Sequence, residues 1–469
     1  MTTASPERYD AIVIGAGQAG GPLASALARS GRRTALIERE HAGGTCINEG
    51  CTPTKTMIAS GRVAYLARRG ADYGVQTGPI AIEMETIRRR KREIVASFRG
   101  GSERRIHETP GLDYLEGEAR FTGAKMLAVA LKSGGTRTLT AGEIFINAGA
   151  RPARPRLEGL ETIPAELVLN STTIMELDHV PDHLLVLGGG VIAVEFGQLF
   201  RRLGARVTIV QRGPKLLGRE DPDVADALAE ILREDGFELL LGAEARRVAP
   251  TEDGLIRLTV ATDEGERDLI GCHLLAAAGR TPNTDRLDPA TGGIHLDERG
   301  FIPVNERLGT NVPGIYALGD VNGGPAFTHI SYDDYRIIKA NLLEGGHRTT
   351  TDRPVPYVVF TDPQLGRVGL SETDARQQGR NIRVAKLPMS SVARALEVDE
   401  PRGFMKAIVD AETDQILGAT VLGLEGGELM SMLEIAMMGK LPYPALRDGV
   451  FAHPTLAEAL NNLFGSFAD

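Results

Sequence analysis

Two cysteines stand close together early in the chain, in the string GGTCINEGCTPTK at residues 43–55. Cys46 and Cys51 are five positions apart, and such residues in a regular α-helix are separated by about 7.5 Å along the axis. A disulfide tolerates a Cα separation of no more than roughly 7 Å. The pair can therefore form a disulfide only if the helix is interrupted, and Gly50 permits such a break.

Three kinds of site could use this pair. A structural zinc ion requires about four ligands, but Cys272 stands far along the chain and no cluster of Cys and His at ligand spacing occurs. Two inert buried thiols are a second alternative. We favour a redox-active dithiol, because a nucleotide-binding motif directly precedes the pair. Cys272 itself is expected to be a small buried hydrophobe.

That motif is a dinucleotide fingerprint in its required context. A β-rich run at 9–14 leads into GAGQAG at 15–20, followed by a helix-like stretch at 22–30 and a β-rich run at 34–37 that ends on Glu38. The spacing of glycines and acid is typical of a strand–turn–helix–strand unit that binds a dinucleotide. A Gly-rich turn without a ligand is the alternative.

Each residue of the fingerprint has a physical role. Gly15 allows the tight turn, Gly17 lets the backbone approach a pyrophosphate, and Gly20 lets helix and strand pack closely. The N-terminus of the helix faces the phosphate anions. Glu38 is expected to accept a hydrogen bond from a ribose hydroxyl.

The pattern recurs in the middle of the chain. The apolar run at 183–187 enters GGGVIA at 188–193, and a helix to Leu203 and a strand at 207–210 follow. This second strand ends in Gln211-Arg212 instead of an acid. A neutral amide with Arg212, and with Lys215 and Arg219 nearby, favours the 2′-phosphate of NADPH over NADH. The alternative is that these bases are solvated surface charges.

The composition excludes several classes of protein. The 469 residues are 42% hydrophobic and 25% charged, as in an ordinary globular protein, and three cysteines are too few for a disulfide-stapled scaffold. The net charge of −9 argues against nucleic acid or an anionic membrane as partner. The run RRRKR at 88–92 is therefore expected to be the solvated face of a helix. Without a visible targeting signal or an apolar run of about 18 residues, we expect a cytoplasmic protein.

Taken together, these motifs resemble the FAD-dependent pyridine nucleotide-disulfide oxidoreductases. The resemblance covers nearly the whole chain and is carried by the cysteine string and by FINAGA, VLGGGVIAVEF, AAAGRTPN, GIYALGD and FAHPTLAE. Within the family, DDYRIIKANLL and the C-terminal segment are most similar to mercuric reductases and to the bacterial reactive-chlorine-resistance flavoproteins, which are regarded as Cu(II) and Hg(II) reductases.

The resemblance implies an α/β fold with two Rossmann-like dinucleotide-binding domains and a C-terminal α+β dimerisation domain. The expected segments are 1–150 for FAD and the dithiol, 151–280 for NAD(P), 281–350 for a return to the FAD-binding part, and 351–469 for dimerisation.

The resemblance also implies cofactor contacts for FAD and for NADPH, with NADH as the alternative. The residues expected to bind FAD are Gly15, Gly17, Gly20, Glu38 and Asp320. Those expected to bind NADPH are Gly188, Gly190, Arg212 and Arg219. Further cofactor contacts are expected at Gly44, Thr45, Lys55, Gly149, Val191, Glu195 and Gly279.

The implied catalytic residues fall into two groups. Cys51 would be the flavin-proximal thiol and Cys46 the thiol that meets the substrate. Lys55 would lie near the flavin and pair with Glu195. The second group, His453 and Glu458, would form an acid–base dyad that reaches the active site of the other subunit of a homodimer.

The chain departs from mercuric reductases in three respects. It ends in NNLFGSFAD without their Cys-Cys pair, and it has His453 where they tend to have Tyr. Because the first fingerprint begins at Tyr9, no N-terminal metal-binding domain is expected. Val191, in contrast, stands where glutathione reductases and dihydrolipoyl dehydrogenases usually have Tyr, and in this respect the chain resembles mercuric reductase.

These observations predict an NADPH-dependent flavoenzyme whose Cys46–Cys51 dithiol reduces a soft metal ion, Cu(II) or Hg(II). No resident metal site is expected, so both cysteines would meet the metal only as substrate. A disulfide reductase of the dihydrolipoyl dehydrogenase or glutathione reductase type is the alternative suggested by His453 and Glu458. A flavin-binding redox sensor without turnover is a third possibility.

Overall fold

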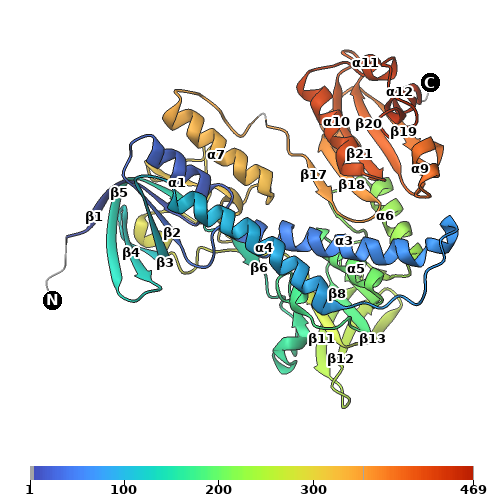
Figure 1. Cartoon of the computed structure of the whole chain (residues 1–469), viewed down its shortest axis with the longest axis horizontal. Helices are drawn as coiled ribbons and strands as arrows, with labels where there is room; N and C mark the ends of the chain where they lie inside the picture. Colours follow the sequence, from blue (N-terminus) through green and yellow to red (C-terminus); the bar gives the residue numbers. More distant parts are fainter. Residues whose placement is uncertain (1–4, 352, 468–469) are drawn as a thin grey trace. The chain divides into compact units, whose positions relative to one another are not determined.

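The computed structural model describes residues 5–351 and 353–467 (Figure 1). The chain forms two compact units, and each collects segments that are distant in sequence. The first unit comprises Met1–Thr56, Glu85–Ala153 and Gly279–Arg353, and the second comprises Met57–Met84, Arg154–Ala278 and Pro354–Asp469.

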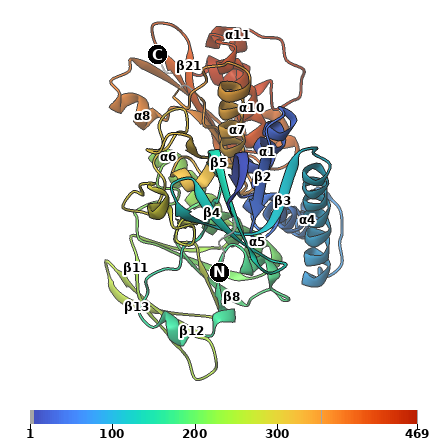
Figure 2. The same ribbon diagram turned by 90° about the vertical axis from the view of Figure 1, so that its left-hand side faces the viewer.

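The first unit is built on a six-stranded sheet (Figure 2). Strand β1 pairs in parallel with β2 on one side and with β5 on the other, so that Ile12 lies opposite both Ala35 and Ile144. The strands β3, β4 and β5 form an antiparallel meander. The bounds are β1 (Glu7–Ile14), β2 (Thr34–Glu38), β3 (Leu112–Gly123), β4 (Met126–Leu131), β5 (Thr136–Ile146) and β16 (Ile315–Ala317), with the separate pair β6 (Ala150–Pro152) and β15 (Arg280–Pro282).

Apolar side chains cover both faces of this sheet, as expected for parallel strands. Leu23 and Leu27 of α1 pack with Phe145 and with Ile337 of α7 on one face. The other face is buried by a separate cluster that includes Phe121. Helices α1 (Gly20–Arg29), α2 (Gly44–Asn48) and α7 (Thr328–Leu343) lie within this unit. Helix α3 (Cys51–Arg68) begins in this unit, and α4 (Met84–His107) belongs to it from Glu85 onward.

The second unit contains a five-stranded sheet in the order β10-β9-β8-β14-β7, with every pairing parallel. Strand β8 enters the turn at 188–190, and α5 follows at once. The bounds are β7 (Val168–Leu169), β8 (His183–Leu187), α5 (Val191–Leu203), β9 (Arg206–Gln211), α6 (Pro222–Glu234), β10 (Glu238–Leu241) and β14 (His273–Ala276). An antiparallel sheet adds β11 (Glu244–Pro250), β12 (Ile256–Thr262) and β13 (Gly265–Gly271).

The C-terminal part of the second unit is an antiparallel sheet in the order β17-β18-β21-β20-β19. Leu429 and Leu433 of α10 pack with Met405 and with Phe464 of α12 in its core. The bounds are β17 (Tyr357–Val359), β18 (Gln364–Gly369), α8 (Glu372–Gln377), β19 (Ile382–Pro388), α9 (Ala393–Glu397), β20 (Phe404–Asp410), β21 (Ile416–Gly423), α10 (Gly426–Met438), α11 (Tyr443–Arg447) and α12 (Ala459–Gly465).

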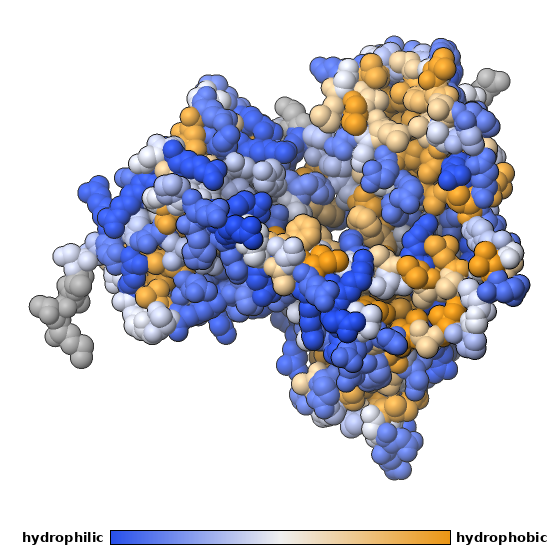
Figure 3. Space-filling view, in the orientation of Figure 1, coloured by the Kyte–Doolittle hydropathy of each residue, from blue (hydrophilic) through white to orange (hydrophobic). Residues whose placement is uncertain are grey.

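Helix α10 exposes apolar side chains as well as burying them. Ile435 and Met438 are 68% and 70% exposed. Figure 3 shows hydrophobic residues gathered over this C-terminal sheet and its helices. Exposed apolar side chains grouped on one helix are typical of surfaces that bind another protein chain.

The predicted fold class is confirmed: both fingerprints follow parallel strands of α/β sheets, and an α+β segment follows them. The finer division into four segments remains a prediction. Two predictions of burial were wrong. In the charged run on α4, Arg89, Arg90 and Arg92 are exposed as predicted, but Lys91 is buried. Cys272 is only half-buried, with its Sγ within hydrogen-bond distance of the backbone of His183.

Candidate active site

The two cysteines lie on either side of a break between helices. Cys46 belongs to α2, and Cys51 is the first residue of α3. At Gly50 a Cβ atom would lie 2.9 Å from the carbonyl oxygen of Thr45 and 3.3 Å from the Cα of Cys46. Glycine therefore lets the chain fold back on itself, which provides the predicted interruption between the cysteines.

The two thiols influence each other strongly. Hydrogen bonding to Cys51, then burial, then the negative charge of Cys51 raise the pKa of Cys46 above its usual range. Two neighbouring thiolates repel each other, so the protonated form of Cys46 is favoured beside Cys51. The positive end of the α3 dipole favours a thiolate at Cys51. The hydroxyl of Thr328 lies 3.3 Å from the Cys51 sulfur.

The first glycine turn has the close approaches that a dinucleotide site needs. Gly15 has a φ of +98°, and a Cβ there would lie 2.3 Å from the carbonyl oxygen of Asn147. At Gly17 a Cβ would lie 2.7 Å from the side-chain oxygen of Asn147, and at Gly20 it would lie 1.9 Å from the carbonyl oxygen of Gly15. At Gly44 it would meet the Cα of Gly17 at 2.8 Å, which brings the dithiol segment against the turn.

Asn147 holds this turn together, and the sequence did not single it out. Its side-chain oxygen accepts from the backbone N–H of Gly20 at 3.0 Å, and its side-chain N–H donates to the carbonyl of Leu318 at 2.8 Å. Nearby, the carboxylate of Glu38 accepts from the backbone N–H groups of Ala16 and Glu40, both at 2.7 Å. The acid is thereby held at the end of β2.

A charged pair from two distant segments lies in the same unit. Burial raises the pKa of Asp320, against the effect of Arg280, whose Nη2 is 3.5 Å from the carboxylate. Among the described residues, Arg280 Nε is buried and has no hydrogen-bond partner. A donor in this state fits a bound polar group, so the glycine turn and this arginine suit the anionic FAD. Three further predicted contacts, Thr45, Gly149 and Gly279, are also in this unit.

The second glycine turn repeats the first. Gly188 has a φ of +107°, and a Cβ there would lie 2.6 Å from the carbonyl oxygen of Ala277. At Gly190 a Cβ would meet nothing within 4 Å, which leaves room beside the first residue of α5, Val191. The loop after β9 leaves the side chains of Arg212 and Arg219 exposed. This arrangement suits a second dinucleotide.

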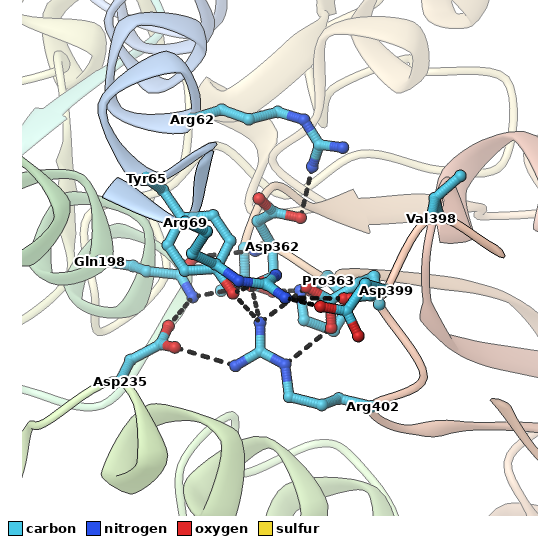
Figure 4. Close-up of polar contacts among 12 residues, drawn as sticks. Arg62, Tyr65, Arg69, Gln198, Asp235, Asp362, Pro363, Val398, Asp399 and Arg402 are labelled. Carbon is cyan, nitrogen blue, oxygen red and sulfur yellow. Dashed lines mark hydrogen bonds and ion pairs between the residues drawn. The ribbon is translucent and has the colours of Figure 1, made fainter. Parts of the chain in front are cut away.

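Helix α5 contacts a segment of the C-terminal part through three of its turns. The buried carboxylate of Glu195 accepts from the N–H of Phe360 at 2.8 Å. Gln198 accepts from the N–H of Asp362 at 2.7 Å and donates to its carbonyl at 3.1 Å (Figure 4). Arg202 forms an ion pair with the carboxylate of Asp362. The orientation of α5 therefore depends on this segment.

Lys55 belongs to the first unit and Glu195 to the second. Their pairing remains a prediction.

His453 and Glu458 lie together as predicted. Nδ1 of His453 is 2.7 Å from Oε2 and 3.0 Å from Oε1 of Glu458. The histidine is exposed and is followed by a cis peptide bond to Pro454. A carboxylate on Nδ1 fixes the tautomer and leaves Nε2 available for proton exchange.

Sequence reasoning missed Thr328, Asn147 and Arg280. Asn147 and Arg280 lie in FINAGA and AAAGRTPN, strings that carried the resemblance, so a residue-by-residue reading could have found them. Thr328 had no signal of its own. Among the described residues, no group of three or more His, Cys, Asp or Glu side chains is arranged to hold a metal ion. No helix within the same ranges is long and apolar enough to span a bilayer.

Comparison with known proteins decides the family. The family model described as pyridine nucleotide-disulphide oxidoreductase matches residues 9–334, and the model of the dimerisation domain of that family matches residues 355–464. The chain belongs to the pyridine nucleotide-disulphide oxidoreductase family. It is therefore a member of a family of flavoprotein oxidoreductases, and its C-terminal sheet with the exposed face of α10 is the family's dimerisation domain.

Members of this family match along almost the entire chain. The probable pyridine nucleotide-disulfide oxidoreductase RclA of Escherichia coli K12 is 40% identical over 460 residues, covering 97% of this chain and 99% of that protein. A mercuric reductase of Lysinibacillus sphaericus is 32% identical over 455 residues, covering 97% of this chain and 82% of that protein.

A solved structure agrees with these relatives. It is described as the Cu(II) complex of the HOCl-induced flavoprotein disulfide reductase RclA from Escherichia coli. It is 39% identical, matches with a TM-score of 0.88, and covers 98% of this chain and 99% of that chain.

Proposed function

We propose that this protein is an NADPH-dependent FAD enzyme whose Cys46–Cys51 dithiol reduces a soft metal ion, Cu(II) or Hg(II). The observation that carries the proposal is the arrangement of the two thiols, in which Cys46 of α2 lies beside Cys51 at the N-terminus of α3. The resemblance of the chain to a flavoprotein solved as a Cu(II) complex supports the choice of metal.

Two sets of residues would hold the cofactors. Gly15, Gly17, Glu38 and Asp320 would bind FAD, with Arg280 as a further donor. The glycine turn at 188–190 would bind NADPH, with Val191, Arg212 and Arg219 around it. Bound FAD would supply the two-electron chemistry that links the nicotinamide to the dithiol.

The dithiol transfers two electrons to the metal ion. Thiolate sulfur is a soft ligand and prefers soft ions. As the bond between the sulfurs of Cys46 and Cys51 forms, the two thiols release two protons and two electrons. These electrons reduce two Cu(II) ions to Cu(I), or one Hg(II) ion to the metal. Thr328 donates a hydrogen bond that steadies the Cys51 thiolate before the metal binds.

Reduction of a disulfide substrate is the second candidate, and the His453–Glu458 pair favours it. A disulfide substrate needs a proton at its leaving sulfur, which Nε2 of His453 can supply. A metal ion needs no such proton. We propose that the dyad acts in the partner subunit's active site within a homodimer.

A panel of electron acceptors tests the proposal. NADPH and NADH oxidation by the purified FAD-loaded protein is measured with Cu(II), Hg(II), lipoamide and glutathione disulfide. The proposal predicts the highest kcat/KM with NADPH and a metal ion. If the protein turns over lipoamide faster than either metal ion, and His453→Ala abolishes that activity, the proposed metal reduction is wrong and the protein is a disulfide reductase.

A further inference from the structure

The loop between β9 and α6 carries the two exposed arginines proposed to bind the 2′-phosphate. Its first half is fixed by the nucleotide motif, since the N–H of Leu217 donates to the carbonyl of Gly189 at 2.8 Å. Lys215 bonds within the loop itself, because its ammonium group donates to the carbonyl of Glu220. The loop thus leaves Arg212 and Arg219 to meet a phosphate.

The second half of the loop is held from outside the nucleotide motif by Arg367 on β18. This side chain is buried, with 7% of the residue exposed. Its Nη1 donates to the carbonyl oxygen of Arg219 at 3.0 Å and lies 3.5 Å from the carboxylate of Glu220. Its Nη2 donates to Asp374 at 2.9 Å. One guanidinium therefore joins β18, α8 and the backbone of the phosphate loop.

Tyr357 on β17 completes this contact. Its hydroxyl donates to the carboxylate of Glu220 and lies 3.3 Å from Nη1 of Arg367. Glu220 is 4% exposed, and burial raises its pKa against the opposing effects of Arg367 and Tyr357. A buried carboxylate that loses such partners is strongly destabilised. The backbone at Arg219 and Glu220 would then have to move.

The next residue, Asp221, anchors the same end of the loop. Its carboxylate accepts from the N–H groups of Glu372 and Thr373, both at 3.0 Å, and from the hydroxyl of Thr373 at 2.6 Å. The start of α6 is therefore fixed to α8. A displacement of the backbone at Arg219 is therefore confined to the loop and does not move α6.

We infer that Arg367 of the dimerisation domain is a positioning residue for nucleotide choice: it sets where Arg219 stands and thereby favours NADPH over NADH. Its planar guanidinium serves Arg219, Glu220 and Asp374 at once, which a lysine ammonium cannot do. The inference rests on the proposed preference for NADPH, and extends it to a residue distant from the nucleotide motif.

The test compares Arg367→Lys with wild type in two measurements. Calorimetry gives the dissociation constants of 2′-phospho-ADP-ribose and ADP-ribose, and steady-state kinetics gives kcat and KM for NADPH and NADH with one acceptor. We expect the phosphorylated ligand to bind about tenfold more weakly, and the KM for NADPH to rise as much. The affinity for ADP-ribose, the KM for NADH and both kcat values should stay within about twofold.

Two further variants accompany Arg367→Lys: one removes a second contact to the loop, and the other is a matched control on the same sheet. Tyr357→Phe should shift the same ratio in the same direction by less, and it retains the bulk of the ring. Arg383→Lys, on β19 of the same sheet, loses its hydrogen bond to Tyr443 and should leave the ratio unchanged. Circular dichroism confirms that each variant is folded.

The measurements distinguish failure of the NADPH assignment from failure of the role inferred for Arg367. A wild-type protein that binds ADP-ribose as tightly as the phosphorylated ligand overturns the NADPH assignment and this inference with it. A wild type that prefers the phosphate, together with an unchanged preference in folded Arg367→Lys and Tyr357→Phe, overturns the inference alone. Equal weakening of both ligands also overturns it, because it indicates general loosening of the domain.

Discussion

The hydroxyl oxygen of Thr328 lies 3.3 Å from the sulfur of Cys51, and the same hydroxyl also hydrogen-bonds Cys46. Thr328 is the first residue of α7 and Cys51 the first residue of α3. Two helix N-termini therefore meet at the dithiol, and their partial positive charges favour a thiolate there. Residues 277 positions apart thus form one reactive site.

Loss of the Thr328 hydroxyl is expected to make the dithiol less reactive. In Thr328→Val the reduced protein should react several-fold more slowly with iodoacetamide at pH 7, because a donor to the thiolate is missing. Thr328→Ser keeps the hydroxyl and should react at close to the wild-type rate. An unchanged rate in Thr328→Val would mean that the helix dipoles and the cofactor, and not this hydroxyl, stabilise the thiolate.

Removing the Asn147 side chain is expected to weaken FAD binding. Asn147→Ala leaves the buried N–H of Gly20 and the carbonyl of Leu318 without partners, at a cost of about 1–3 kcal/mol. The purified variant should retain less flavin, measured as the ratio of absorbance at the flavin band to that of protein. Asn311→Ala removes an exposed amide that also makes two backbone hydrogen bonds and should retain flavin normally. Equal retention in both variants would contradict a role for Asn147.

The sequence predicted the parts of the site that short motifs encode. The turn at 15–20, Glu38 and the Cys46–Cys51 spacing each have a local geometric reason, whereas the pairing of His453 with Glu458 was implied only by the family resemblance. Thr328 could not be predicted in this way, because its contact with Cys51 arises from the sheet that brings α7 to the dithiol.

The two wrong predictions have a similar cause. Lys91 was assigned to solvent because charge runs usually are solvated, and its burial depends on what packs against α4. Cys272 was assigned to the core because free cysteines usually are buried. Its position between β13 and β14 places its sulfur against the backbone of His183. Both outcomes depend on tertiary neighbours that residue type does not encode.

Lys406 is expected to be essential for the stability of the second unit. Its ammonium group, on a residue 1% exposed, lies 2.9 Å from Asp221 and 2.8 Å from Asp223. Lys406→Met leaves the buried carboxylate of Asp221 without its ion pair and should cost about 3–5 kcal/mol in denaturant unfolding at pH 7. Lys386→Met removes a more exposed partner of Asp223 and should cost less than about 1 kcal/mol. Similar losses in both variants would contradict this assignment.

The contribution of Lys406 should also depend on pH. Burial alone would raise the pKa of Asp221 and of Asp223, but hydrogen bonds from Lys406 and neighbouring groups outweigh it, and both pKa values are lowered. The stabilisation is therefore present above the unfolded pKa of about 3.9 and is lost as pH falls through the lower folded value. The difference in unfolding free energy between wild type and Lys406→Met should shrink below about pH 4. A difference that grew in acid would have the wrong sign.

The His453–Glu458 dyad is expected to matter for disulfides and not for metals. Glu458→Gln and His453→Ala should lower kcat for lipoamide by about 10²-fold or more, while kcat for Cu(II) should change by only a few-fold. If the dyad acts across a homodimer, mixing His453→Ala with Cys46→Ser subunits should restore part of the disulfide activity. No recovery, in mixtures where subunit exchange is verified, would place the dyad in its own subunit.

The central claim is that the Cys46–Cys51 dithiol delivers electrons to the metal ion. The most direct measurement is the anaerobic rate of Cu(I) formation from Cu(II) and NADPH, followed with a Cu(I)-specific chelator, in wild type, Cys46→Ser, Cys51→Ser and Cys272→Ser. Flavin content is matched among the four proteins. We expect Cu(I) formation to fall by at least about 10²-fold in the first two variants and to stay near wild type in Cys272→Ser. Wild-type rates in folded, flavin-loaded Cys46→Ser and Cys51→Ser would contradict the claim.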